Sequence, residues 1–454
     1  MTSVERSRPY TPQREDPAVL AARTVGRERL LASLQRSFRS AATKANRNHT
    51  LLVGPRGSGK SHVIEVALHA LRQDAALASR FAVVRLPEDA MGLVGIERVT
   101  ALVCADLGVR SPPASLAAQQ QAIHVALDGR VLLLVAENLD RVMRALGPGG
   151  QRDLRSWVET SGDVLLLAST PLLFAGVQDR DKPWYGAFAT IAVPPLTPRE
   201  GHELLLRLAG QHGDSALAEH LRTPRGRARV RALAELTGGS PRVWTILSGC
   251  VTPESLDALV PAVHELLEEL VPAYQQLLWD LPPGEQVVVE ALSTGRHAAL
   301  TVSELAAATG IGQPQVSKIV RGLAANRWVV ADKLPRGDQR RTWYQLREPL
   351  LRHHVAYRAG ELGVVTLVAS LLREYFEVGR ARGPATARAA VRLGTEVGTD
   401  DAGAGLLATV TAALDGSAEA RLRVPLELRA LVEEPSVPAG RGRAAAGGEA
   451  PGAA

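Results

Sequence analysis

Two patterns of apolar residues alternate over the first 200 residues. Short runs of consecutive apolar residues are separated by longer segments in which apolar residues recur every three or four positions. The runs predict strands that are buried on both faces of a parallel sheet, and the longer segments predict helices that cover it. The strands are expected at residues 50–54, 81–86, 130–136, 163–169 and 190–193. The predicted fold class is therefore α/β.

The pattern changes after residue 197. Residues 198–279 keep a helical period without strand-like runs, and the last helix of this block is expected at 254–281. A Pro-Pro-Gly triplet then marks a boundary. We divide the chain into a disordered lead-in at 1–20, an α/β core at 21–197, a helical lid with a connecting helix at 198–281, a unit of helices and a hairpin at 282–358, a helical region at 359–434 and a disordered low-complexity tail at 435–454.

Composition narrows the class of protein. The hydrophobic fraction of 46% and the charged fraction of 22% are those of globular proteins. The N-terminus has no apolar segment of a signal peptide, and no apolar run approaches the roughly 18 residues of a membrane span. We therefore expect a cytoplasmic protein with no membrane partner. Two cysteines are too few for a disulfide framework or a cysteine-based zinc site.

A phosphate-binding loop follows the first predicted strand. The segment LLVGPRGSGKS places the pattern G-x-x-x-x-G-K-S between that strand and an amphipathic helix. Its glycines let the backbone N–H groups face a phosphate chain, Lys60 can reach the β- and γ-phosphates, and the Ser61 hydroxyl can ligate Mg²⁺. We expect ATP and Mg²⁺ as ligands. The nucleotide-binding residues of the loop are Gly54, Pro55, Arg56, Gly57, Ser58, Gly59, Lys60 and Ser61.

A second element of such a site is an acid at the tip of a neighbouring strand. The run VLLLVAENLD ends in Glu137 and Asn138. In one registration Glu137 helps to hold the metal, and Asn138 stands where a water-activating glutamate is usual. In the other, Glu137 activates the water and Ala136 stands at the metal position. In the first registration the Asn138 amide cannot accept the proton of the attacking water, and in the second the metal position has no acid. Either way one acid is missing, which predicts slow hydrolysis.

Three further segments resemble motifs of the AAA+ superfamily, above all its origin-recognition/initiator clade and the related signal-transducing (STAND) ATPases. TVGRERLLASL resembles the box that precedes the phosphate loop, LLLAST resembles the sensor 1 strand, and LTGGSPRVWTIL resembles the lid segment that returns to the nucleotide. The order of the motifs matches over residues 24–250. The fold that this implies is a P-loop NTPase parallel sheet with a helical lid.

The resemblance implies roles for the matched residues. Val25 and Gly26 would lie against the adenine, and Arg27 would brace the same turn. Thr170, or its neighbour Ser169, would sense the γ-phosphate.

Arg242, at the sensor 2 position, would bridge the lid to the phosphates, although GGSPR is also typical of a plain helix start with proline near its first turn. The family usually has an aspartate and a glutamate where this chain has Glu137 and Asn138. The catalytic candidates are therefore Glu137, Asn138, Thr170 and Arg242. Arg180 could serve a neighbouring subunit as an arginine finger if the core self-associates, or could be a solvated loop charge.

The segment at residues 300–330 predicts two short helices joined by a glycine-containing turn. Thr301 and Glu304 form a capping box, Gly310 ends the first helix, and Pro314 suits the first turn of the second. The pattern after residue 328 predicts two strands around a basic tip. Together these elements resemble a MarR-like winged helix, so the C-terminal part is expected to be all-α with a winged helix.

The charge pattern favours duplex DNA as a partner of this unit. Residues 318–358 carry ten Lys/Arg and three Asp/Glu, a net charge of +7, and the whole chain carries +6. Basic side chains supply phosphate contacts, and glutamines can read base edges. The alternative is a protein-docking unit with solvated arginines. The expected DNA-binding residues are Gln313, Gln315, Ser317, Lys318, Arg321, Lys333, Arg336, Arg340 and Arg341.

These features lead to three hypotheses of function. The first is an ATP-binding, slowly hydrolysing switch that couples nucleotide state to DNA binding. The second is a STAND-type signalling ATPase whose winged helix and C-terminal helices bind a protein partner. The third is a transcriptional regulator with a degenerate ATPase, which the intact phosphate loop disfavours.

Overall fold

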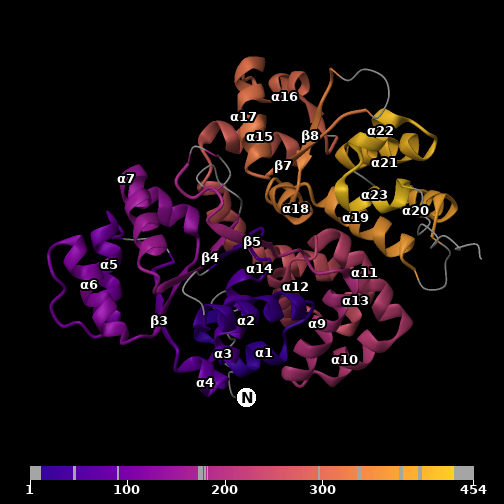
Figure 1. The fold of residues 1–454 in the computed structure, drawn as a ribbon. Helices are drawn as coiled ribbons and strands as arrows, with labels where there is room; N and C mark the ends of the chain where they lie inside the picture. The colour runs from indigo at the N-terminus through magenta and orange to yellow at the C-terminus, as the bar shows by residue number, and fades with distance from the viewer. Residues whose placement is uncertain are drawn as a thin grey trace, which may run out of the picture.

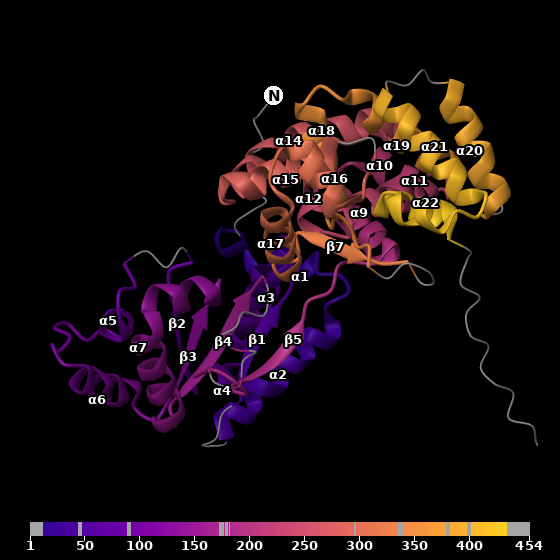
Figure 2. The ribbon, with the colours of Figure 1, turned by 90° about the horizontal axis from the view of Figure 1, so that it is seen from above.

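The fold separates into a sheet-containing core and a helical body that holds the rest of the chain (Figures 1 and 2). The computed structural model describes residues 12–43, 48–88, 92–171, 177, 180, 182–294, 297–334, 340–377, 382–396 and 401–433. Arg336 and the predicted tail at 435–454 lie outside the described residues. No helix among the described residues is long and apolar enough to cross a membrane.

The core is built on a five-stranded sheet in which every pairing is parallel, in the order β2-β3-β4-β1-β5. Its strands are β1 (His49–Val53), β2 (Phe81–Arg85), β3 (Val131–Ala136), β4 (Val164–Thr170) and β5 (Phe188–Ala192). Every residue of β1, β3 and β4 is buried. The predicted α/β class and the five predicted strands are confirmed.

Helices cover both faces of the sheet. The core helices are α2 (Glu28–Thr43), α3 (Lys60–Gln73), α4 (Ala75–Ala78), α5 (Ile96–Asp106), α6 (Leu116–Leu127) and α7 (Leu139–Thr160). Leu133 of β3 packs in one cluster with α2 and α3, and its neighbours Leu132 and Leu134 pack in another with α5, α6 and α7. Successive residues of a strand point to opposite faces, which explains why apolar runs fill these strands.

The parallel register brings the candidate motifs to one edge. Val53 pairs with Thr170, and Ala136 pairs with Ala168. The phosphate loop after β1, Glu137 after β3 and the end of β4 therefore lie together at the carboxyl ends of the strands, where α/β sheets bind ligands.

The expected disordered lead-in is wrong for residues 12–20. Pro12–Arg14 form the 3₁₀ helix η1, and Pro17–Ala22 form α1. Asp16 caps α1, since its carboxylate accepts a hydrogen bond from the backbone N–H of Ala18. These short elements contain proline and charged residues and have no apolar period, so the sequence pattern did not indicate them. Tertiary contacts stabilise them.

The lid is a set of helices joined by short turns. They are α9 (Pro198–Gln211), α10 (Ser215–Arg222), α11 (Pro224–Thr237), α12 (Pro241–Cys250), α13 (Pro253–Ala258) and α14 (Val260–Trp279). The single helix expected at 254–281 is wrong in one respect. Leu259 has a positive φ of 65° and divides α13 from α14.

The next unit combines helices with a small antiparallel sheet of order β6-β8-β7. Its elements are α15 (Pro283–Thr294), β6 (Leu300–Thr301), α16 (Val302–Thr309), α17 (Gln313–Ala325), β7 (Val329–Asp332), β8 (Trp343–Leu346) and α18 (Pro349–Arg358). Thr301 and Glu304 form the expected capping box, and Gly310 ends α16 in the left-handed conformation.

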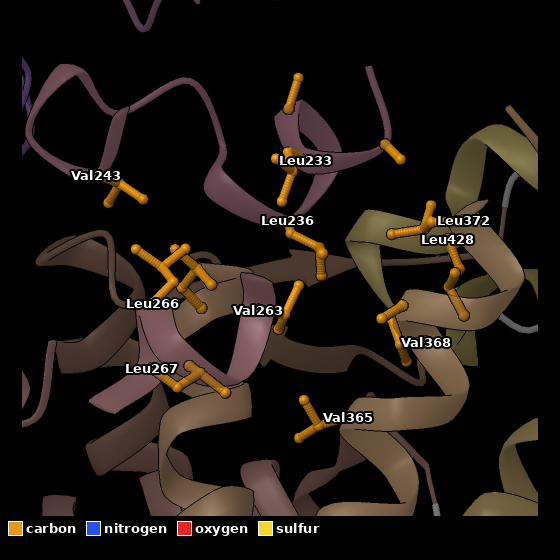
Figure 3. Close-up of a cluster of buried hydrophobic side chains, with 14 of the residues drawn as sticks. Leu233, Leu236, Val243, Val263, Leu266, Leu267, Val365, Val368, Leu372 and Leu428 are labelled. Carbon is orange, nitrogen blue, oxygen red and sulfur yellow. The ribbon is translucent and has the colours of Figure 1, made fainter. Parts of the chain in front are cut away.

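The C-terminal helices pack on the lid and on this unit. They are α19 (Leu362–Tyr375), α20 (Pro384–Glu396), α21 (Asp401–Leu414), α22 (Ala418–Arg423), η2 (Leu426–Leu428) and α23 (Arg429–Val432). Figure 3 shows Leu236 and Val263 of the lid facing Val365 and Val368 of α19. One continuous apolar cluster thus joins the lid, the unit at 283–358 and the C-terminal helices.

A buried ion pair fastens η2 to α18. The Arg352 guanidinium donates to Glu427 Oε1 at 3.0 Å, and His353 Nε2 lies 2.8 Å from the same oxygen. All three side chains are at most 7% exposed. His353 and Arg352 hold the pKa of the Glu427 carboxyl at about 2, although burial alone would raise it.

Glu427→Ala is expected to lower the free energy of unfolding by about 3–5 kcal/mol, because Arg352 and His353 would remain buried without their carboxylate. Since the folded pKa of Glu427 lies below the unfolded value of 4.5, its contribution is present above that value and is lost as the pH falls toward about 2. Urea unfolding at about pH 7 and pH 3 measures both effects. Glu419→Ala, which removes a partly exposed pair on α22, is the control, and equal stabilities of the two variants would contradict the prediction.

Candidate nucleotide-binding site

The phosphate loop has the backbone of an anion cradle. Gly57 and Gly59 have positive φ values of 80° and 89°, a conformation that favours glycine. A Cβ on Gly54 would lie 2.7 Å from the carbonyl oxygen of Val193, so this position also needs glycine. Helix α3 begins at Lys60, directly after the loop. The N–H groups of the loop and of the first helical turn therefore suit a phosphate group.

Lys60 is held inside the loop. Its ammonium group donates to the carbonyl oxygens of Gly54 at 2.7 Å and Pro55 at 3.0 Å. Burial lowers the pKa of Lys60 from 10.5 to about 8, which the charge of Glu137 opposes and that of Arg56 reinforces. Neutral carbonyls are weaker partners for a buried cation than a phosphate oxygen. The lysine is therefore suited to bind a phosphate chain.

Glu137 lies beside Ser61 at the adjacent strand end. The Ser61 hydroxyl donates to Glu137 Oε2, and the Gln13 amide donates to Glu137 Oε1 at 3.0 Å. Burial raises the pKa of Glu137, and both hydrogen bonds oppose that rise. The pairing of the loop hydroxyl with this acid favours the registration in which Glu137 belongs to the metal position.

These groups fit Mg²⁺ as part of a nucleotide site. A hydroxyl and a carboxylate supply hard oxygen ligands, and Mg²⁺ usually completes its shell with phosphates and water. Among the described residues no group of three His, Cys, Asp or Glu could hold a metal ion without such help. Ser61 and Glu137 are the residues that would hold Mg²⁺, which would neutralise phosphate charge.

The next position carries no acid. Asn138 is the N-cap residue of α7 and has the left-handed conformation, and its amide donates to the backbone carbonyl of Glu88 at 3.3 Å. Glu88 follows β2, the strand beside β3, and faces the same cavity. Glu88 is absent from the candidates predicted from the sequence, because the motif places the acid on the strand that bears Glu137. The sequence signal that could have identified Glu88 is an acid three residues after the end of a neighbouring parallel strand.

The segment before α2 braces the loop. The Arg27 guanidinium donates to the carbonyl oxygens of Pro194 at 2.7 Å and Ser58 at 3.2 Å, so it ties the loop to the strand end after β5. Burial lowers the pKa of Arg27. Val25 is buried and lines the cavity, and Gly26 has a positive φ of 64°. Arg27, which was predicted to brace this turn, therefore connects the phosphate loop to the segment after β5.

Two of the predicted sensor residues line the cavity, and the third, Thr170, forms a hydrogen bond with Asp140. Ser169 lines the cavity, and the Thr170 hydroxyl donates to Asp140 at 3.3 Å. Arg242 lines the cavity from the lid, and its backbone N–H donates to the carbonyl oxygen of Gly57 at 3.3 Å. Arg180 is exposed and does not line the cavity.

These residues enclose a cavity of about 330 Å³ between the core and the lid. The positive side chains lining it are Arg23, Arg27, Arg56, Lys60, Arg141 and Arg242. Glu88 and Glu137 are the carboxylates among the described residues that line it. Apolar contacts come from Val25, Leu196 and Leu204. An excess of cations beside apolar side chains fits a ligand with a polyanionic part and a flat apolar part.

The parallel sheet and the phosphate loop after β1 define a P-loop NTPase fold. The sequence profile described as "AAA ATPase domain" matches residues 23–271, more than half of the chain. The chain belongs to this AAA ATPase domain family. A search among curated proteins finds no match.

Several solved structures resemble the fold. The ORC2 protein of Aeropyrum pernix, solved in ADPNP–ADP complexes, has 13% identity and a TM-score of 0.52, with 76% of this chain and 99% of that chain covered. The ORC1 protein of the same organism in complex with DNA has 16% identity, a TM-score of 0.44, and 76% and 97% coverage. The Thermotoga maritima RuvB branch migration motor has 17% identity, a TM-score of 0.36, and 73% and 98% coverage. The first likeness shows the fold alone, and the two lower scores support no conclusion about this chain.

We expect ATP affinity to fall as the pH rises above about 8, because Lys60 then loses its proton and binding must restore it. The dissociation constant should rise by up to about tenfold per pH unit above that value. Calorimetric titration at about pH 7, 8 and 9 measures the change. Lys60→Arg, which stays protonated throughout this range, should bind with little dependence on pH. An equally flat profile for the wild type would contradict the lowered pKa.

Proposed function

We propose that the chain is an ATP-binding switch that hydrolyses ATP slowly and couples its nucleotide state to duplex DNA binding through a MarR-like winged helix. The observation that carries the proposal is a contact between the cavity and the connecting helix. Arg56 of the phosphate loop and Arg141 of α7 both line the cavity, and both pair with Asp280 at the end of α14.

Nucleotide binding has three sources of support. The chain belongs to the AAA ATPase domain family. The loop has the positive φ values at Gly57 and Gly59 and the close backbone approach at Gly54 that require glycine, as expected of a backbone that wraps a phosphate chain. Ser61 and Glu137 bring together the hydroxyl and the carboxylate that a nucleotide-bound Mg²⁺ requires. Slow turnover follows from Asn138, whose amide cannot accept a proton.

The Asp280 contact suits a switch because it is weak. The distances from Asp280 Oδ2 are 3.6 Å to Arg56 and 3.8 Å to Arg141, and these side chains are 38–50% exposed. Such surface pairs contribute up to about 1 kcal/mol each. The γ-phosphate of ATP would compete for the same arginines and release the end of α14. Because α15 follows this end directly, the release would reach the winged helix.

A second connection runs through the lid. The Tyr274 hydroxyl of α14 donates to Glu348 Oε1 at 2.5 Å, at the start of α18. Burial raises the pKa of Glu348, and the charge of Arg242 opposes that rise. Arg242 also lines the nucleotide cavity. One arginine thus lies between the proposed phosphate site and the base of the winged helix.

The unit at residues 283–358 supports the DNA part of the proposal. Its order of helix, strand, two helices and two strands is that of a winged helix. Val316, Val320 and Leu323 bury one face of α17, which would be the recognition helix. Ser317 is half-buried. The other described candidates are exposed: Gln313, Gln315, Lys318, Arg321, Lys333, Arg340 and Arg341.

The helices α19–α23 favour a second candidate function. They continue the apolar cluster of the lid, so a change in lid position would also move them. In this alternative the chain is a STAND-type signalling ATPase, and these helices present a surface to a protein partner. Self-association through the core would place the exposed Arg180 against a neighbouring subunit, where it could act on the neighbour's nucleotide.

The wild type is expected to bind duplex DNA at least about tenfold more tightly with ATP than with ADP, and the affinity should fall steeply with salt because phosphate contacts carry it. Lys318→Ala/Arg321→Ala should weaken binding about tenfold or more, and Arg110→Ala, an exposed arginine of the core, should not. Fluorescence anisotropy with labelled duplex measures each affinity. Equal affinities with the two nucleotides would reject the coupling. A Lys318/Arg321 variant that still binds DNA normally would favour the signalling alternative.

Asp280→Asn is expected to raise DNA affinity in the ADP state, because the contact that restrains α14 is lost. The ratio between the ATP and ADP affinities should therefore shrink toward one. Glu219→Gln, an exposed change on α10, is the matched control and should keep the wild-type ratio. The same anisotropy titration decides the matter, and an unchanged ratio in Asp280→Asn would exclude this contact as the coupling element.

A further inference from the structure

We propose that Glu88 is the general base that activates the attacking water, in place of the acid that is absent at position 138. This inference rests on the proposed ATP hydrolysis and assigns its missing proton acceptor. The carboxylate comes from the end of β2, whereas the motif would supply it from the end of β3.

Strand pairing places Glu88 beside Asn138. Arg85 pairs with Val135, and the backbone N–H of Leu86 donates to the carbonyl oxygen of Val135 at 2.9 Å. The segment after β2 therefore still runs beside the end of β3. The Asn138 amide then donates to the carbonyl oxygen of Glu88 at 3.3 Å. Asn138 therefore fixes the backbone that bears the Glu88 carboxylate.

The other acids near the cavity already have partners. Glu137 accepts hydrogen bonds from Ser61 and Gln13, and Asp140 accepts one from Thr170. In the described part of the chain, Glu88 is the remaining carboxylate that lines the cavity, and it is exposed. Glu88 and Glu137 also line a second cavity together, which agrees with a position of Glu88 close to the metal residues.

The step that we assign is an in-line displacement. The water oxygen forms a bond to the γ-phosphorus as its proton passes to the Glu88 carboxylate. The bond from the γ-phosphorus to the bridging oxygen breaks, and its electron pair leaves with ADP. Lys60 holds the phosphate charge that develops. An exposed carboxylate that is fixed only through its backbone is a loosely positioned base, which agrees with slow turnover.

Single-turnover hydrolysis and ATP binding by the full chain test the assignment. Glu88→Gln should lower the hydrolysis rate by at least about 10²-fold and change ATP affinity by less than about twofold, because a base acts on the water and leaves the nucleotide contacts intact. Adding Asn138→Glu to Glu88→Gln should restore the rate to within about tenfold of the wild type. Glu97→Gln, an exposed change outside the cavity, is the matched control.

Several results would overturn the assignment. One is a Glu88→Gln variant that keeps the wild-type rate. Another is a loss of rate that Asn138→Glu does not restore, which would mean that residue 88 acts through structure. A wild type that binds ATP and hydrolyses none would also reject Glu88 as a base and would leave the nucleotide-binding switch standing. Absence of ATP binding would reject the proposed function, and the role of Glu88 with it.

Discussion

The excess of positive charge around the cavity is the constraint on which the rest of the site depends. Five arginines and Lys60 face two carboxylates there. The buried cations among them, Arg23, Arg27 and Lys60, must have partners, because an unpaired buried charge is costly. Lys60 uses loop carbonyls, Arg27 uses carbonyls of two elements, and Arg56 uses Asp280 at 3.6 Å. A triphosphate would be a better partner for several of them at once. Nucleotide binding would therefore rearrange these contacts, including those that hold the connecting helix.

The packing of the helical body would extend such local changes to whole units. The lid, the unit at 283–358 and the C-terminal helices share one apolar cluster, and the buried Arg352–Glu427 pair fastens the last helices to α18. Packed cores transmit displacement because their side chains leave few voids. By contrast, the contacts from Asp280 to the core are long and half-exposed. The Asp280 contacts would therefore break at little cost when the nucleotide state changes.

The sequence predicted the parts of the site that depend on local pattern. Apolar runs located all five strands, because strands buried on both faces have no polar positions. The phosphate loop was recognisable because glycines and Lys60 occur at fixed spacing. The sequence did not predict the places of Gln13, Glu88 and Asp280, because each contacts a residue far away in the chain. Gln13, for example, contacts Glu137. Polar residues in short connecting segments have no periodicity, so only the tertiary structure shows their contacts.

Binding of Mg²⁺ and ATP to the full chain tests the central claim most directly. Isothermal titration with ATP, with and without Mg²⁺, should show about one site per chain whose affinity depends on Mg²⁺. Glu137→Gln should remove most of the Mg²⁺ dependence, and Lys60→Ala should weaken binding by about 10²-fold or more while the fold is retained by circular dichroism. Equal affinities of wild type and Lys60→Ala, or no binding at all, would contradict the assignment of this cavity as a nucleotide site.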